Sequence, residues 1–162
     1  LVQFAANDPQ IFAEAAKVVA PYCAGVDLNC GCPRRRAIQA GGGSALLRNH
    51  QLVYDLARRC TSEVTVPVSV KIRLNSDLQQ TVDLCRSLTE MAGVKTITVH
   101  GRTPSQRPSD PVDYEAIRVI KAALQSGAKM LANGAIFSLQ DAQRVHEMTG
   151  VDGVMAGPWN LG

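Results

Sequence analysis

The sequence predicts an α/β protein that forms part of a (β/α)8, or TIM, barrel, with six parallel strands and five helices. Three observations predict it. Short apolar runs alternate strictly with longer amphipathic segments, which is the pattern of right-handed βαβ units. The G-x-G-x-x-G fingerprint is missing after the first run, which weakens the competing doubly wound open sheet. A full barrel needs eight strands and roughly 250 residues, so the six strands predicted in these 162 residues make up about three quarters of one.

The six predicted strands are short apolar runs, several of them rich in β-branched residues. No internal repeat or linker separates them, so residues 1–162 are expected to form one domain. In chain order the strands are 2–6, 25–29, 67–73, 96–100, 129–133 and 151–156.

The five predicted helices carry apolar residues at helical spacing. Asp8 and Pro9 open the first one as an N-cap followed by proline at the first helical position. Ser138 and Asp141 open the last one as a capping box, with Asp in place of the usual Glu. In chain order the helices cover approximately 9–19, 49–61, 77–91, 112–124 and 138–148.

Composition narrows the class of protein. An apolar fraction of 46% without low-complexity runs predicts a folded chain. No apolar run approaches the ~18 residues that a membrane span needs, and no basic, apolar leader opens the chain. We therefore expect a monomer with no membrane partner, in the cytoplasm, with the nucleus as the other compartment considered.

Cysteine spacing and charge narrow it further. Five cysteines are an odd number without a disulfide framework. Cys30 and Cys32 flank a single glycine, too close for zinc spacing, and no His or Cys pair follows, so no metal is expected. The net charge of +3 is mild, but Arg34, Arg35 and Arg36 are consecutive and suit phosphate groups.

Five of the predicted strands end in polar or glycine residues. Because side chains alternate along a strand, Lys71 and Arg73 share one face, as do Thr98 and His100. The carboxyl ends of parallel strands meet at one edge, where α/β barrels build their active sites. The strand ends are Asp27-Leu28-Asn29, Lys71-Ile72-Arg73, Thr98-Val99-His100, Ala132-Asn133-Gly134 and Met155-Ala156-Gly157.

These ends share one chemical character. Lys71, Arg73, His100 and Arg102 are donors or cations, and the absence of a carboxylate pair argues against glycosidase chemistry. Neither a G-x-S-x-G nor an H-E-x-x-H motif occurs. The set favours an electron-rich ligand such as a phosphate, a flavin or a pyrimidine-like ring. Late glycines lie where barrels often hold phosphate on backbone N–H groups: Gly134, Gly153 and Gly157.

Cys32 is the candidate acid. It follows a strand end and precedes Pro33, which stiffens the loop. A thiol ordinarily carries its proton at neutral pH and can donate it directly. A nucleophile would need a neighbouring base, and none is visible nearby in the sequence. The other four cysteines are interpreted as small packing residues.

Six segments occur in a fixed order: D-L-N-C-G-C-P at 27–33, G-G-G-S-A-L-L at 41–47, V-K-I-R at 70–73, V-H-G-R-T at 99–103, A-N-G-A-I at 132–136 and D-G-V-M at 152–155. Together they resemble the tRNA-dihydrouridine synthases, flavin enzymes that reduce a uridine ring in transfer RNA. The match spans nearly the whole chain and looks closest to the eukaryotic branch that modifies positions 20a and 20b. The first, third and fourth segments are jointly specific.

The resemblance implies FMN as cofactor, with NADPH or NADH as reductant, and tRNA as substrate. Reduced FMN would deliver hydride to C6 of uracil while Cys32 protonates C5. The residues implied at the isoalloxazine and ribityl are Gln3, Lys71, His100 and Asn133, with Gly134 and Gly157 near the phosphate. The residues implied at the target uracil are Asn29, Arg73 and Arg102, and those at backbone phosphates are Arg34 and Arg35.

Two departures accompany the resemblance. The family usually carries an arginine after the last strand, where this chain has Ala156-Gly157-Pro158-Trp159, and Pro158 lacks a backbone N–H. The family's first two barrel strands and its C-terminal helical domain are not matched, so a fragment of the catalytic domain is expected. Two alternatives stay open: an FMN-dependent barrel oxidoreductase for a free small molecule, and a truncated, non-catalytic RNA-binding or vestigial paralogue.

Overall fold

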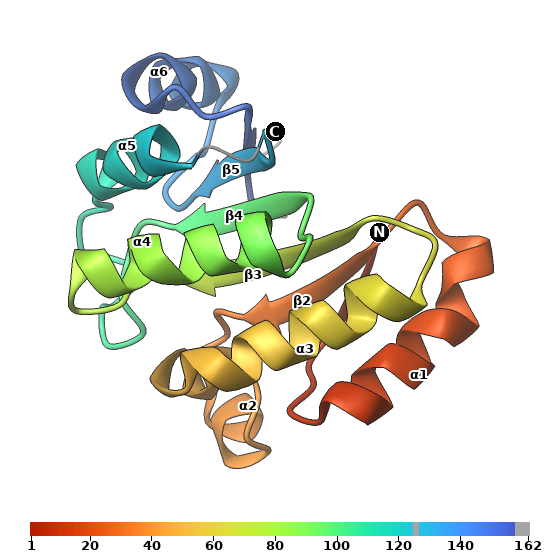
Figure 1. Ribbon diagram of the computed structural model, residues 1–162. Coiled ribbons are helices and arrows are strands. Elements are labelled where there is room, and N and C mark those ends of the chain that lie inside the picture. The colour runs from red at the N-terminus through yellow and green to blue at the C-terminus, as the bar shows by residue number, and fades with distance from the viewer. Residues whose placement is uncertain (125–126, 158–162) are drawn as a thin grey trace.

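The computed structural model describes residues 1–124 and 127–157, and Pro158 and Trp159 of the expected chain ending lie outside them. Its centre is one parallel sheet of six strands, as predicted (Figure 1). The strands lie side by side in chain order, whereas a doubly wound sheet reverses its order at a switch point. They are β1 (Val2–Phe4), β2 (Val26–Cys30), β3 (Val68–Arg73), β4 (Thr96–His100), β5 (Lys129–Asn133) and β6 (Gly153–Met155).

The outer strands are shorter than predicted. β1 stops at Phe4 and β6 covers only Gly153–Met155, against expected ranges of 2–6 and 151–156. Each of these strands has a hydrogen-bonded neighbour on one side only among the described residues. The sheet is therefore an open arc rather than a closed barrel.

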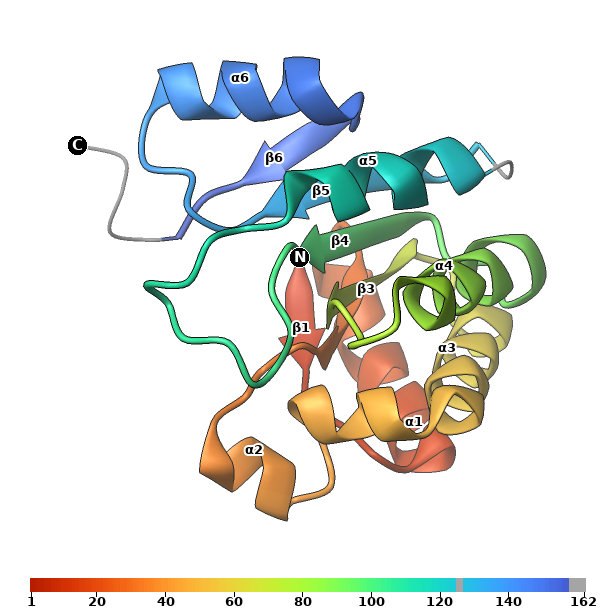
Figure 2. The ribbon, with the colours of Figure 1, turned by 90° about the vertical axis from the view of Figure 1, so that its left-hand side faces the viewer.

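Helices connect successive strands and lie on one side of the sheet, because every right-handed crossover between neighbours taken in chain order falls on the same face (Figures 1 and 2). Five were predicted, and the described residues contain six α-helices. They are α1 (Pro9–Val19), α2 (Arg35–Gln39), α3 (His50–Glu63), α4 (Leu78–Arg86), α5 (Tyr114–Ala123) and α6 (Leu139–Thr149).

The additional helix is α2, which lies between the strand predicted at 25–29 and the helix predicted at 49–61, where no helix was predicted. Arg35–Gln39 contains good helix formers directly after the extended residue Arg34, and it makes one short helix. Gly43–Arg48 continues as a 3₁₀ segment. The helix predicted at 77–91 is α4 followed by a π-helical turn, Ser87–Met91. None of the described helices is long and apolar enough to span a membrane.

The two predicted N-caps, Asp8 and Ser138, are confirmed. Asp8 accepts a hydrogen bond from the Ile11 N–H at 2.9 Å, with Pro9 as the first helical residue. Ser138 accepts from the Asp141 N–H at 3.1 Å, and the Asp141 carboxylate accepts from the Phe137 N–H at 3.1 Å. The Asp in the capping box thus reaches one residue further back than the usual Glu does.

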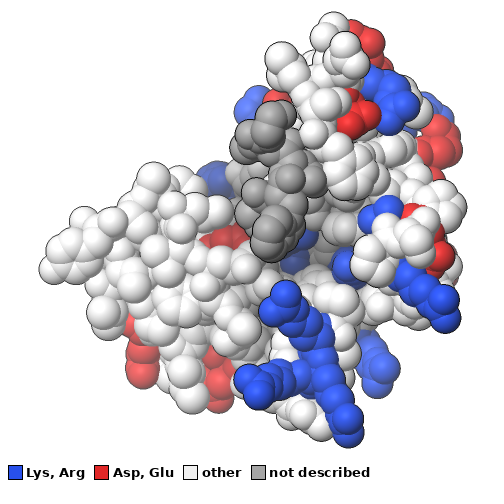
Figure 3. Space-filling view, turned by 180° about the vertical axis from the view of Figure 1, so that it is seen from behind, with Lys and Arg blue, Asp and Glu red and all other residues white. Residues whose placement is uncertain are grey.

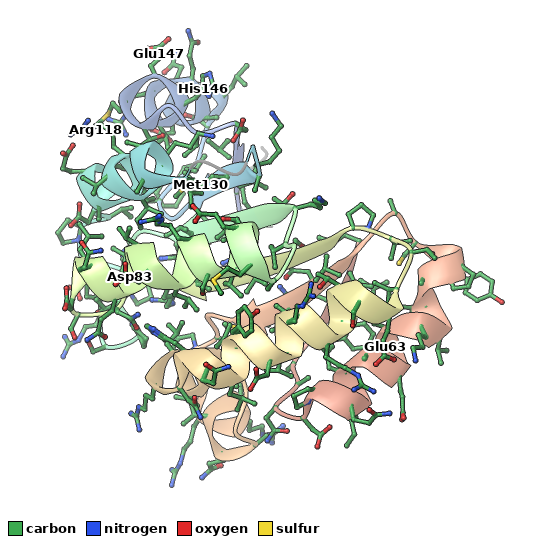
Figure 4. The ribbon with its side chains drawn as sticks, viewed as in Figure 1. Glu63, Asp83, Arg118, Met130, His146 and Glu147 are labelled. Carbon is green, nitrogen blue, oxygen red and sulfur yellow. The ribbon has the colours of Figure 1, made fainter. Side chains whose placement is uncertain are left out.

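The two faces of the sheet differ in chemistry. The side chains that point toward the helices are apolar and almost completely buried, as with Leu28, Val70, Ile97 and Met130. Figure 4 shows Met130 between β5 and the helices, whereas charged residues such as Glu147 project from the helices into solvent. The opposite face carries the polar residues of the same strands, because side chains alternate. In register they are Gln3, Asp27 and Ser69, then Asn29, Lys71 and Thr98, then Arg73, His100 and Asn133.

Candidate active site

A pocket of about 320 Å³ lies at the carboxyl ends of the strands, on the polar face of the sheet. Parallel α/β barrels place their active sites at this edge. The pocket brings together six of the residues implied by the sequence, along with three neighbours. Its lining consists of Gln3, Asn29, Gly31, Cys32, Pro33, Lys71, Arg73, His100 and Met155.

Cys32 is held at both ends of its backbone. Its N–H and that of Gly31 donate to Oδ1 of Asn29 at 3.0 and 3.1 Å. Its carbonyl oxygen accepts from the N–H of Ser44 at 2.9 Å. Gly43 lies so close that a Cβ there would sit 2.6 Å from that carbonyl oxygen, and its φ of +57° also favours glycine. The glycine-rich loop thus fixes the cysteine loop against the pocket.

The remaining cysteines fit the packing role expected of them. Cys30, Cys60 and Cys85 are buried, and Cys23 is half-buried. Burial raises the pKa of Cys85 to about 12 and that of Cys60, which also faces the charge of Glu63, to about 11. Cys32 is half-buried and is the only cysteine that lines the pocket among the described residues.

Three basic side chains define the electrostatics of the pocket. Burial, together with the nearby charge of Arg73, lowers the pKa of Lys71, whose Nζ donates to Asn133 Oδ1 at 2.8 Å. Burial also lowers the pKa of His100 to about 3, with added repulsion from Arg73, Lys71 and Arg102. His100 is therefore neutral at physiological pH, and Lys71 and Arg73 supply the positive charge. A group that is negative or electron-rich is favoured here.

Asn133 and Gly134 lie directly beside this lining. Asn133 binds Lys71 and also donates through Nδ2 to the Met155 carbonyl oxygen at 2.6 Å. Gly134 has a φ of +115°, and a Cβ there would lie 3.3 Å from Cε1 of His100. Ala135 follows with a φ of +49°. Non-glycine residues with a positive φ are found preferentially at functional sites.

Other implied residues lie apart from the lining. Arg102 is 7% exposed, and its Nε donates to the Asp110 carbonyl oxygen at 2.6 Å, so it braces its own loop. Gly157 is half-buried beyond β6 and does not line the pocket. Arg34 and Arg35 are exposed at the start of α2, a few residues after Cys32.

A basic surface adjoins the pocket. Figure 3, which shows the molecule from behind, has Lys and Arg side chains projecting together from one edge. Arg34, Arg35, Arg36 and Arg48 are all exposed, and no Asp or Glu occurs anywhere in residues 28–54. None of the four forms an ion pair with a described residue, whereas Arg59, Arg86, Arg118 and Arg144 on the helices do. This surface suits a polyanion.

Sequence reasoning gave no role to Asp27 and Ser69. Both are buried on the polar face, and the Ser69 hydroxyl donates to Asp27 at 2.5 Å. The signal was present in the alternation of β2, which places Asp27 on the same face as Asn29. A buried carboxylate needs partners, and Ser69 occupies the paired position on β3.

The pocket fits the donor set that a flavin requires. Nδ1 of His100 is buried and has no hydrogen-bond partner among the described residues, so it is available to a hydrogen-bonding group of a ligand. Lys71 and Arg73 add donors with positive charge, which suit the electron-rich edge of an isoalloxazine ring. No group of three or more metal-ligating side chains converges in the described parts of the chain.

The fold and the position of the pocket define a β/α-barrel type of protein, and comparisons with solved structures agree. DHODH from Eimeria tenella superposes with a TM-score of 0.70 over 95% of this chain and 50% of its own, at 11% identity. Phosphonopyruvate hydrolase superposes with a TM-score of 0.66 over 97% of this chain and 58% of its own, at 16% identity. At such identities the likeness is one of fold alone.

Sequence comparisons give the family. The model for dihydrouridine synthase (Dus) matches residues 1–162, so the chain belongs to the dihydrouridine synthase family. A human protein named tRNA-dihydrouridine(20a/20b) synthase (NAD(P)+)-like is 46% identical over 96% of this chain and 49% of its own length. The fission yeast tRNA-dihydrouridine(16/17) synthase is 37% identical over 99% of this chain and 41% of its own length. The chain therefore spans about half the length of the curated relatives it matches.

Proposed function

We propose that this chain is the flavin- and uridine-binding part of a tRNA-dihydrouridine synthase, which reduces a uridine of tRNA to 5,6-dihydrouridine. Family membership supports the reaction class, and the 46–48% identity to mammalian proteins named for positions 20a and 20b supports that branch. The observation that carries the proposal is the fixed position of Cys32. Its backbone is held by Asn29 and Ser44 at the edge of a cationic pocket.

FMN would be held by Lys71, His100, Gln3 and Asn133, with Gly134 and Gly157 toward the phosphate. When bound and reduced, FMN supplies the hydride that C6 of uracil accepts, and NADPH or NADH supplies the electrons. The cationic charge of Lys71 would favour a flavin ring that carries negative charge. Neutral His100 would contribute its unpartnered Nδ1 as a hydrogen-bonding group.

Cys32 would donate its thiol proton to C5 of the uracil ring, so that the C5=C6 double bond becomes saturated. The sulfur would then bear a negative charge in the pocket that Lys71 and Arg73 also line, where these two cations would stabilise it. Water would reprotonate the sulfur before the next cycle. Arg73 would contact the uracil, and Asn29 would serve chiefly to hold the loop, because its amide oxygen is occupied by two backbone N–H groups.

The tRNA would reach the pocket across the basic surface of Arg34, Arg35, Arg36 and Arg48. Contacts to phosphates position a nucleic acid without reading its sequence. A stacked uridine must leave its stack before a flavin can reach its ring. Arg102 braces the loop whose Thr103 carbonyl oxygen accepts from Nη1 of Arg73 at 3.0 Å, so its role would be to hold that loop rather than to bind uracil directly.

The test uses the full-length gene product, incubated with FMN, NADPH and tRNA from a strain that lacks dihydrouridine synthases. We expect bound-flavin absorbance and new dihydrouridine at position 20a or 20b by mass spectrometry of tRNA fragments. Reduction of free uridine or another free pyrimidine, without any reduction of tRNA, would instead indicate a small-molecule oxidoreductase. Flavin binding with no reduction of either substrate would contradict the proposal.

A further inference from the structure

Behind Cys32, four polar side chains form a continuous chain of hydrogen bonds that crosses three strands. Asp27 in β2 is 3% exposed, and its Oδ1 accepts from the Ser69 hydroxyl of β3 at 2.5 Å. Its other oxygen accepts from Nε2 of Gln3 in β1 at 2.7 Å. Oε1 of Gln3 accepts from Nδ2 of Asn29 at 3.0 Å. Asn29 then accepts the N–H groups of Gly31 and Cys32.

The direction of this chain is set at Asp27. An ionised carboxylate can only accept, so Gln3 must turn its NH2 group toward Asp27 and its oxygen toward Asn29. Asn29 must then turn its NH2 group toward Gln3, which leaves its oxygen facing the loop. If Asn29 were reversed, its NH2 group would meet the N–H groups of Gly31 and Cys32, which are also donors. If Gln3 were reversed, its oxygen would meet the Asp27 carboxylate and its NH2 group would meet that of Asn29. One buried carboxylate thus fixes the orientation of two amides.

We propose that Asp27 is a positioning residue, which holds the Cys32 loop through Gln3 and Asn29 and thereby aims the Cys32 thiol. This role rests on the proposed function, in which Cys32 donates the proton. Ser69 anchors the second carboxylate oxygen, so that Asp27 cannot rotate away from Gln3. Asp27 is not among the residues that line the pocket, so its contribution would be to the geometry of Cys32, which is.

The hydrogen bonds themselves can be tested without any activity. Amide hydrogen exchange at Gly31 and Cys32 reports their bonds to Asn29 directly. We expect Asp27→Ala to accelerate exchange at both N–H groups by roughly tenfold, the effect of losing one buried hydrogen bond. Asp27→Asn keeps an oxygen that can accept from Gln3, so it should restore most of the protection.

Two further variants keep this measurement interpretable. Thr149→Val removes a similarly buried side-chain hydrogen bond, from Thr149 to the Val145 carbonyl oxygen in α6. It should destabilise the protein without changing exchange at Gly31 and Cys32. If Asp27→Ala does not fold, Gln3→Met breaks the same chain at an exposed residue of β1. Unchanged exchange in the folded Asp27→Ala or Gln3→Met variant would overturn the proposal.

Steady-state kinetics test whether the orientation of Cys32 set by Asp27 matters for the reaction. In the full-length enzyme at saturating FMN, we expect Asp27→Ala to lower kcat by roughly tenfold while KM for tRNA changes by less than about threefold, since the exposed arginines proposed to bind tRNA are unchanged. Asp27→Asn should recover most of kcat. Faster exchange with unchanged kcat would overturn the positioning role. A wild-type enzyme that forms no dihydrouridine would defeat the proposed function, while the exchange experiment would still decide the hydrogen-bond chain.

Discussion

The two faces of the sheet are built from the same strands but differ in role: one packs against the helices, and the other lines the pocket. The face toward the helices carries Leu28, Val70, Ile72, Ile97 and Val99, none of which is measurably exposed. The other face carries residues such as Asp27, Lys71, Arg73 and His100, each of which is costly to bury without a partner. Alternation along a strand separates the two sets by one residue.

This separation teaches that stability and chemistry can be altered independently at neighbouring positions. Burial of apolar area on one face stabilises the sheet. The polar face contributes less of this stabilisation, but its side chains hydrogen-bond to one another and are thereby held in fixed orientations around the pocket. Substitutions on the apolar face should therefore lower the free energy of unfolding with little change in the activity of the folded protein. Substitutions at the pocket should lower the activity more than the free energy of unfolding.

The largest effect is expected at Cys32. Cys32→Ala removes the proposed proton donor and should lower kcat for dihydrouridine formation by about 10²–10⁴-fold, the usual contribution of general acid catalysis. The unfolding midpoint should hardly change, because Cys32 lies at the rim of the pocket. Cys23→Ala, at a half-buried cysteine outside the pocket, is the matched control. A Cys32→Ala enzyme with nearly wild-type kcat would assign the proton to another group.

The apolar face should give the largest change in stability. Leu28 is fully buried between Asp27 and Asn29, so Leu28→Ala should lower the free energy of unfolding by about 2–5 kcal/mol. Urea denaturation measures this directly. Ile11→Ala, at a residue that is 65% exposed on α1, should cost less than about 0.5 kcal/mol. Similar costs for both variants would contradict the division between the faces.

On the polar face, replacing Lys71 should have an effect of intermediate size, on the affinity for FMN. Lys71→Met keeps the length of the side chain and removes its charge, and a hydrogen bond to a charged group is worth about 1.5–3 kcal/mol. The affinity for FMN should fall by about tenfold to a hundredfold, as measured by flavin fluorescence titration. Lys95→Met is the control, because Lys95 is exposed at the opposite end of the neighbouring strand. Equal flavin affinity in the two variants would remove Lys71 from the flavin site.

The sequence predicted the regular parts of the fold well, for a physical reason. β4 and β5 have the predicted ends, Thr96–His100 and Lys129–Asn133, since apolar alternation and flanking turns define strands that are paired on both sides. Strand β1 was predicted too long, because the end of an outer strand depends on its neighbour. Helix α2 was not predicted, because a helix of five residues is too short to show periodicity.

The candidate site was predictable as a set of residue types but not as a network. Polar strand ends indicated Lys71, Arg73 and His100, and the pocket contains all three. The hydrogen bond from Arg102 to Asp110 depends on how one loop folds back, which periodicity does not encode. The role of Asp27 depends on which strand lies beside β2, and only the sheet order reveals that Gln3 and Ser69 flank it.

The smallest effect expected is a pH dependence of stability that arises at His100. Its pKa is about 3 in the folded protein, against about 6.5 for an unperturbed histidine. Between these values the unfolded chain binds a proton that the folded one does not, so stability falls as pH decreases from about 6.5. One proton gives at most about 1.4 kcal/mol per pH unit, and the partial exposure of His100 makes the slope smaller.

Urea denaturation of the wild type and of His100→Gln at about pH 7 and pH 5 isolates this contribution. The pH range stays above the normal pKa of Asp152, whose pKa is lowered by Lys121 and by the Met130 N–H, so that carboxylate stays ionised. The wild type should lose more stability than His100→Gln over this range. His146→Gln, at an exposed residue of α6, should behave as the wild type does. If the wild type and His100→Gln lose the same stability, His100 is protonated in the folded protein, and the cations Lys71 and Arg73 do not face it as closely as the sheet register requires.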